Sequence, residues 1–140
     1  MTTDLVLDAA ARSTAGVLLV ALVAVEYGGT FLLRVTRGQH PASPLQQSFF
    51  RAGHAHAGVL VVLALVALLY VGAADLEGVL ERVASQGVAF AAILMPAGFF
   101  LSVLGRDVVR PNRWIALVWL GAASLAAGVL TLGVGLLTAG

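Results

Sequence analysis

Residues 14–33 read TAGVLLVALVAVEYGGTFLL, and Glu26 is the only charged residue among them. About 20 residues at 1.5 Å each give a helix roughly 30 Å long, which matches the hydrocarbon thickness of a bilayer. A charge at that depth costs roughly 2.5–3.5 kcal/mol, so a carboxylate there is rarely kept without a use. The stretch therefore predicts a membrane-spanning helix that carries a candidate functional residue.

The rest of the chain has the same apolar character. Hydrophobic residues make up 60% of the 140 residues and charged residues 11%, whereas soluble domains carry about a quarter charged residues. The apolar runs are continuous rather than alternating, which favours helices over a transmembrane barrel. We expect an all-α integral membrane protein, a single four-transmembrane-helix bundle over residues 1–140, with helices at approximately 14–36, 44–74, 84–105 and 113–138.

Composition also excludes several classes of function. No cysteine is present, which excludes a disulfide framework, a thiolate metal site and a cysteine nucleophile. No sizeable basic face exists for binding nucleic acid. Asp4 and Asp8 precede the first apolar run, where a cleavable signal peptide would carry positive charge, so we expect the first helix to be retained. The expected surroundings are a lipid bilayer.

The arginines predict the orientation in that bilayer. The first and third connections between helices are basic, whereas the second carries Asp75, Glu77 and Glu81 against a single arginine. Basic connections stay in the cytoplasm under the positive-inside rule. We therefore expect a multi-pass protein of the plasma membrane with both termini on the non-cytoplasmic side. The basic residues that set this orientation are Arg34, Arg37, Arg51, Arg106, Arg110 and Arg113.

The first connection ends in a helix-start signal. Ser43-Pro44-Leu45-Gln46 offers a serine N-cap, proline at the first helical position and glutamine at the third. This order fits a capping box, in which the two polar side chains bond to each other's backbone N–H groups. It predicts that the second helix begins near Pro44.

The fourth helix carries small residues at heptad spacing. Gly121, Gly128 and Gly135 recur every seven residues, and Ser124 and Thr131 follow the first two by three. Small residues let membrane helices approach closely, so we interpret this stripe as packing between helices or subunits. It makes a homo-oligomer, or assembly with other membrane subunits, plausible. A pore lined by the hydroxyl groups is the alternative.

The candidate polar site combines the first two helices. Arg51 and His54 lie three residues apart on one face of the second helix, and His56 is turned about 200° from His54. Glu26 lies roughly 12 Å of helix before Arg34, on the side from which the second helix enters. We therefore expect these five residues to form a protonatable site in the inner half of the bundle. The structural alternatives are a Glu26–arginine pair that serves assembly and histidines bonded to carbonyl groups.

A transition metal or haem is a further possibility for the histidines. His54-x-His56 supplies two imidazoles, but the rings point to different sides of a regular helix. A zinc or copper site would need more ligands from Glu26, His40 or another chain. Haem would need axial histidines on suitable faces of the bundle.

Four interpretations of function follow from these residues. The first is a channel, carrier or ligand-binding membrane protein that uses Glu26 and the histidines, since intramembrane acid–histidine relays move protons. The second is a structural or accessory membrane subunit. The third is a redox protein holding haem or a metal, and the fourth is a membrane enzyme acting on a lipid-like substrate. The sequence leaves open whether the protein is an enzyme.

The enzyme interpretation draws on one resemblance. Four helices in 140 residues, with Arg51-Ala52 leading into the second helix, resemble the membrane-associated eicosanoid and glutathione metabolism proteins. Those proteins carry an Asn-x-x-Glu pattern just after the arginine segment. This chain has Gly53-His54-Ala55-His56-Ala57-Gly58 there, with neither residue. The resemblance therefore covers the layout and does not extend to a glutathione site.

Overall fold

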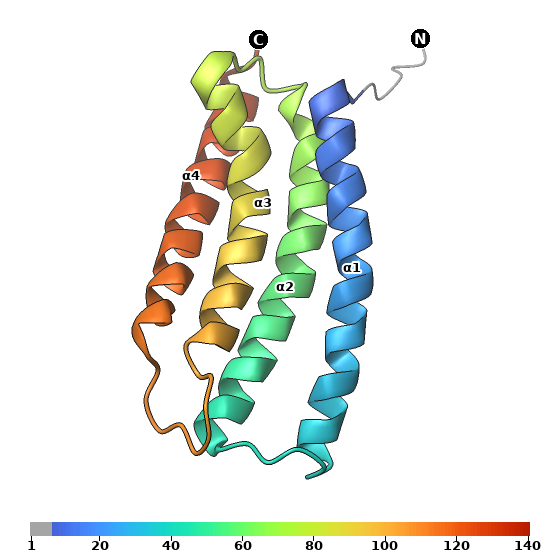
Figure 1. Ribbon diagram of the computed structural model, residues 1–140. Coiled ribbons are helices and arrows are strands. Elements are labelled where there is room, and N and C mark those ends of the chain that lie inside the picture. The colour runs from blue at the N-terminus through green and yellow to red at the C-terminus, as the bar shows by residue number, and fades with distance from the viewer. Residues whose placement is uncertain (1–6) are drawn as a thin grey trace.

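The computed structural model describes residues 7–140 and consists there of α-helices and one 3-10 turn, with no strand. Each α-helix, the last one taken together with the 3-10 turn before it, is long and apolar enough to cross a membrane. The predicted fold class is confirmed, and these features are those of a small membrane protein. The elements are α1 (Ala9–Thr36), α2 (Pro44–Val71), α3 (Gly78–Leu101), η1 (Arg113–Ile115) and α4 (Ala116–Thr138) (Figure 1).

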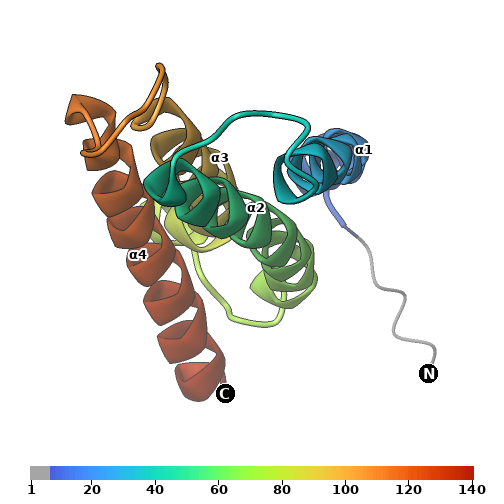
Figure 2. The ribbon, with the colours of Figure 1, turned by 90° about the horizontal axis from the view of Figure 1, so that it is seen from below.

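The helices pack in chain order into an open arrangement. α1 lies on α2, α2 on α3 and α3 on α4, while α1 and α4 make no contact within the described residues (Figure 2). Both basic connections lie at one end of the molecule, and the acidic α2–α3 connection lies at the other with the C-terminus (Figure 1). We call these the basic end and the acidic end.

Local capping sets the starts of the first two helices. α1 begins at Ala9 rather than near residue 14, because the Asp8 carboxylate accepts the Ala11 N–H at 2.6 Å and extends the helix beyond its apolar run. The predicted capping box at α2 is confirmed. The Ser43 hydroxyl accepts the Gln46 N–H at 3.3 Å, and the Gln46 side chain accepts the Ser43 N–H at 2.9 Å.

Two connections between helices begin or end at residues other than those predicted. α2 ends at Val71 instead of residue 74, and α3 begins at Gly78 instead of residue 84. Asp75 and Gly78 have φ of 47° and 61°, so the chain turns sharply between them and the next helix starts early. α3 also ends at Leu101 rather than near residue 105. Apolar composition predicts which residues lie in the membrane core, but the turn residues determine where each helix begins and ends.

The small-residue stripe of α4 packs against α3 within the chain. A Cβ added to Gly128 would lie 3.1 Å from the Gly87 Cα, and one added to Gly121 would lie 2.4 Å from a side-chain carbon of Met95. The Ser124 hydroxyl donates to the Gly87 carbonyl at 2.8 Å, so it serves this contact. Backbones thus meet where the stripe was predicted to allow close approach.

The outward surface of the helices is strongly apolar. Trp119 is 73% exposed and Leu137 is 87% exposed, and many other valines and leucines are uncovered. Monomeric soluble proteins rarely expose contiguous apolar surface on this scale. Such a surface is suited to contact with membrane lipid.

Candidate functional site

His54 lies on the side of α2 that faces α1. A Cβ added to Gly29 would lie 3.5 Å from Cε1 and 3.6 Å from Nε2 of the imidazole, and one added to Gly28 would lie 3.7 Å from Nδ1. These are ordinary van der Waals distances, so alanine would fit but a longer side chain would meet the ring. The His54 ring therefore lies in contact with Gly28 and Gly29 of α1.

His56 lies on another side of α2, toward α3. Its Nδ1 is 2.7 Å from the carbonyl oxygen of Ala52, and its ring centroid is 5.0 Å from that of Phe99. Because a carbonyl oxygen only accepts, Nδ1 carries the hydrogen in this bond. His56 thus has the carbonyl-bonded role that the sequence left open for the histidines.

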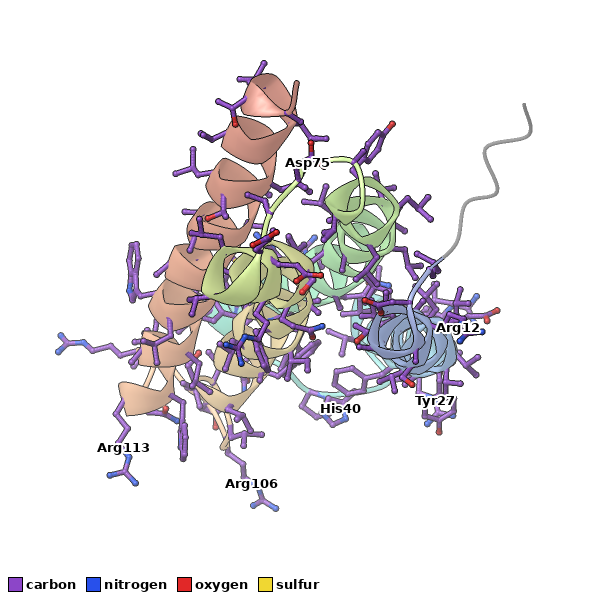
Figure 3. All side chains as sticks on the ribbon, turned by 90° about the horizontal axis from the view of Figure 1, so that it is seen from above. Arg12, Tyr27, His40, Asp75, Arg106 and Arg113 are labelled. Atoms are coloured by element: carbon purple, nitrogen blue, oxygen red, sulfur yellow. The ribbon has the colours of Figure 1, made fainter. Side chains whose placement is uncertain are left out.

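Glu26 lies on the exposed side of α1. Its neighbour Tyr27, which is 74% exposed, and Arg12 point away from the other helices in Figure 3. Gly29, which contacts the His54 ring, is three residues after Glu26. Residues three apart on a helix are neighbours on its surface. Glu26 is therefore about one helical turn from the His54 contact.

Glu26 and His54 are equally many residues from the basic ends of their helices. Glu26 precedes the end of α1 at Thr36 by ten residues, and His54 follows the start of α2 at Pro44 by ten residues. Each is therefore roughly 15 Å along its own helix from that helix's basic end. His54 thus lies against α1 within about one helical turn of Glu26, while His56 lies across α2.

A shallow apolar groove adjoins His54. It has a volume of about 430 Å³, and His54 is the only residue with a polar side chain among those lining it. Glu26 directly follows one lining residue, Val25, on α1. The groove is lined by Val25, His54, Ala55, Gly58, Val59 and Val62.

The two predicted arginines lie nearer the basic end. Arg34 is exposed in the last turn of α1, where a cation also interacts favourably with the helix dipole. Arg51 is exposed, and its Nε donates to the Gln47 carbonyl of its own helix at 3.2 Å. These placements suit side chains that reach the lipid headgroups. The membrane-depth part of the candidate site is Glu26 with His54.

The sequence did not reveal how Gln46 anchors the basic end. This buried side chain donates from Nε2 to the carbonyls of Val103 and Gly105, at 3.0 Å each. Ser43 adds a bond from its hydroxyl to the Val108 carbonyl at 2.6 Å. The capping box identified both residues, but nothing in it signalled their bonds to the α3–α4 connection.

Aromatic rings close the bundle between the histidines and the basic end. Phe31 of α1 meets Phe50 of α2 edge-on at 5.2 Å, and Phe50 stacks on Phe100 of α3 at 5.7 Å. A Cβ on Gly53 would lie 2.9 Å from the Phe100 ring, so glycine is needed there for the close approach. Phe50 thus packs α2 against both α1 and α3.

The histidines do not complete a metal site within the described chain. Among residues 7–140, no group of three or more His, Cys, Asp or Glu side chains could hold a metal ion. His54 faces α1 and His56 faces α3, so the two rings serve different surfaces. A metal ion bound by three or more such side chains would need ligands from outside residues 7–140.

Comparisons of the chain with models of protein families, with curated proteins and with solved structures find no match.

Proposed function

We propose that this small membrane protein is a carrier that takes up and releases protons at Glu26 and His54. The observation that supports the proposal is that the His54 imidazole of α2 lies against Gly28 and Gly29 of α1, within about one helical turn of the Glu26 carboxylate. Ionisable residues inside membrane segments commonly mark proton or ion pathways.

The two side chains have complementary chemistry for proton transfer. A carboxylate accepts a proton, and a neutral imidazole accepts at one nitrogen while it donates from the other. His54 is half-buried and borders the groove, so its ring is reachable without unpacking α2. Water beside the groove can therefore carry a proton between His54 and Glu26, which is about one helical turn from the His54 contact.

The position of the site favours a carrier over an open channel. Between Glu26 and Thr14, which accepts a bond from Gln86 at 3.3 Å, α1 contains only apolar residues. That stretch spans roughly 18 Å, too far for a single proton transfer. A proton at Glu26 therefore needs a movement of α1, or a partner, to reach the acidic end.

The distribution of charged residues predicts the side of the membrane with which the site exchanges protons. With the basic connections in the cytoplasm, as the positive-inside rule predicts, the Glu26–His54 site lies in the inner half of the plasma membrane. Both termini are then on the non-cytoplasmic side, and the site exchanges protons with the cytoplasm.

A proton-flux assay in liposomes tests this function. Wild-type protein is expected to move protons when a potassium diffusion potential is applied. Glu26→Gln should reduce that flux roughly 100-fold, the lower end of what a positioned proton-transfer group contributes, because an amide cannot take up the proton. His54→Phe should reduce it as well, since phenylalanine keeps the ring against Gly28 and Gly29 but has no nitrogen.

His56→Phe is the matched control. It changes the same residue type on the same helix, but at the side that faces Phe99 of α3. Its flux should stay close to wild type. Absence of flux in the wild type would remove the proposed function, and equal loss in both histidine variants would remove the assignment to His54.

A further inference from the structure

We infer that a second copy of this chain covers the outer face of α1 and α2, with Glu26 of each copy bonded to His54 of the other. The inference uses the same two side chains as the proposed function but does not require proton transport. It begins from the exposure of Glu26 on the outside of a helix that spans the membrane. A carboxylate facing hydrocarbon is costly, so a partner that bonds to it stabilises the assembly.

The symmetry of the site selects a second copy as that partner. Copies inserted with one orientation are related by an axis along the membrane normal, which preserves depth. Glu26 is two to three residues from Gly28 and Gly29, against which the His54 ring lies, so the two side chains are within about one helical turn in depth. A twofold axis therefore brings both Glu26–His54 pairs together at once, an acceptor against a donor in each.

The surface beside His54 can admit a helix. The groove contains Ala55 and Gly58, whose small side chains let a neighbouring backbone come close. A Cβ on Gly58 would find nothing of its own chain within 4 Å, so the space is open to a partner. Val25 lines the groove and directly precedes Glu26 of the same copy.

The other small-residue surface is already used. Gly121 and Gly128 of α4 pack on α3 of the same chain, so that stripe is not free to join two copies. The rest of α4, residues 116–138, contains no charged residue, and lipid can cover its outer side. The α1–α2 face is thus the one whose chemistry calls for a protein partner.

Mixing two variants tests the inference. A tagged Glu26→Leu chain and an untagged His54→Phe chain are co-expressed, extracted in mild detergent and analysed by native mass spectrometry. Each homodimer lacks both pairs, whereas the mixed dimer keeps one, from Glu26 of the second chain to His54 of the first. The association constant of the mixed dimer should exceed those of the two homodimers, after correction for statistics, by roughly 3- to 20-fold, the range for one hydrogen bond between membrane helices.

A bond within one chain gives a different result. Neither variant could form it, so the mixed dimer would have no advantage, and a statistical mixture would overturn the inference. A wild type that is monomeric at every detergent and lipid ratio tested would overturn it too, pointing to another membrane protein as the partner of Glu26.

A variant in which the two residues are exchanged tests the inference even if the single variants misfold. The double substitution Glu26→His with His54→Glu recreates both pairs in reverse and should dimerise within a few-fold of the wild type. Failure of the swap, while the chain still elutes as a folded species, would contradict the inference. Dimerisation without proton flux would remove the proposed function alone, and flux from a monomer would remove the dimer alone.

Discussion

Leucine at Gly128 is expected to cost about 3 kcal/mol of folding free energy, the upper end for overpacking a close contact. Its first side-chain carbon would already lie 3.1 Å from the Gly87 Cα and 3.1 Å from the Val88 nitrogen, and both are backbone atoms that a rotamer change cannot move. α4 would have to shift away from α3, which also breaks the bond from Ser124 to the Gly87 carbonyl. The measurement is the midpoint of thermal unfolding of the detergent-purified protein.

Gly133→Leu is the matched control for that prediction. It lies on the same helix, but a Cβ at Gly133 meets nothing within 4 Å. Leucine also has the better helix propensity, by nearly 1 kcal/mol. Its unfolding midpoint should equal or exceed that of the wild type. A Gly128→Leu protein that unfolds at the wild-type temperature would show that α3 and α4 do not meet at Gly87 and Gly128.

Gln46→Leu is the second large expected effect. Leucine fills a similar volume but leaves the carbonyls of Val103 and Gly105 without their donor and Ser43 without its capping partner. The buried Val103 carbonyl left unsatisfied costs about 1–3 kcal/mol, and the lost bonds at the more exposed Gly105 and Ser43 add about 1 kcal/mol. Hydrogen exchange should show the α3–α4 connection opening first, and the unfolding midpoint should fall.

Gln47→Leu provides the comparison. The Gln47 side chain makes one bond, from Nε2 to the Ala42 carbonyl at 3.0 Å, within its own segment of the chain. It should cost about 1 kcal/mol and leave exchange in residues 102–112 unchanged. Equal effects of the two substitutions would mean that Gln46 acts only as a helix cap.

The sequence predicted the helices well because membrane insertion is governed by local composition. Continuous apolar runs identified all four helices, and the Ser43–Gln46 capping box identified the start of α2 at Pro44. The ends were less accurate, since they depend on single residues such as the Asp8 cap and the turn at Asp75. Those residues lie outside the apolar runs, so hydropathy does not register them.

The candidate site was harder to predict because it depends on which helices are neighbours. Helical periodicity alone separated His54 from His56, and the structure places them toward α1 and α3. Helical periodicity could not show that the His54 ring contacts Gly28 and Gly29, since that contact depends on the packing angle of α1. The glycine stripe of α4 indicated close packing but carried no information on whether its partner was α3 or a second copy.

The most direct test of the central claim is labelling of Glu26 with a lipid-soluble carbodiimide, followed by intact-mass analysis and proton-flux measurement on the same proteoliposomes. A carboxyl group on the outside of α1 at membrane depth should take one adduct, Glu26→Gln should take none there, and proton flux should fall in proportion to the labelled fraction. Complete modification of Glu26 with undiminished proton flux would contradict the account.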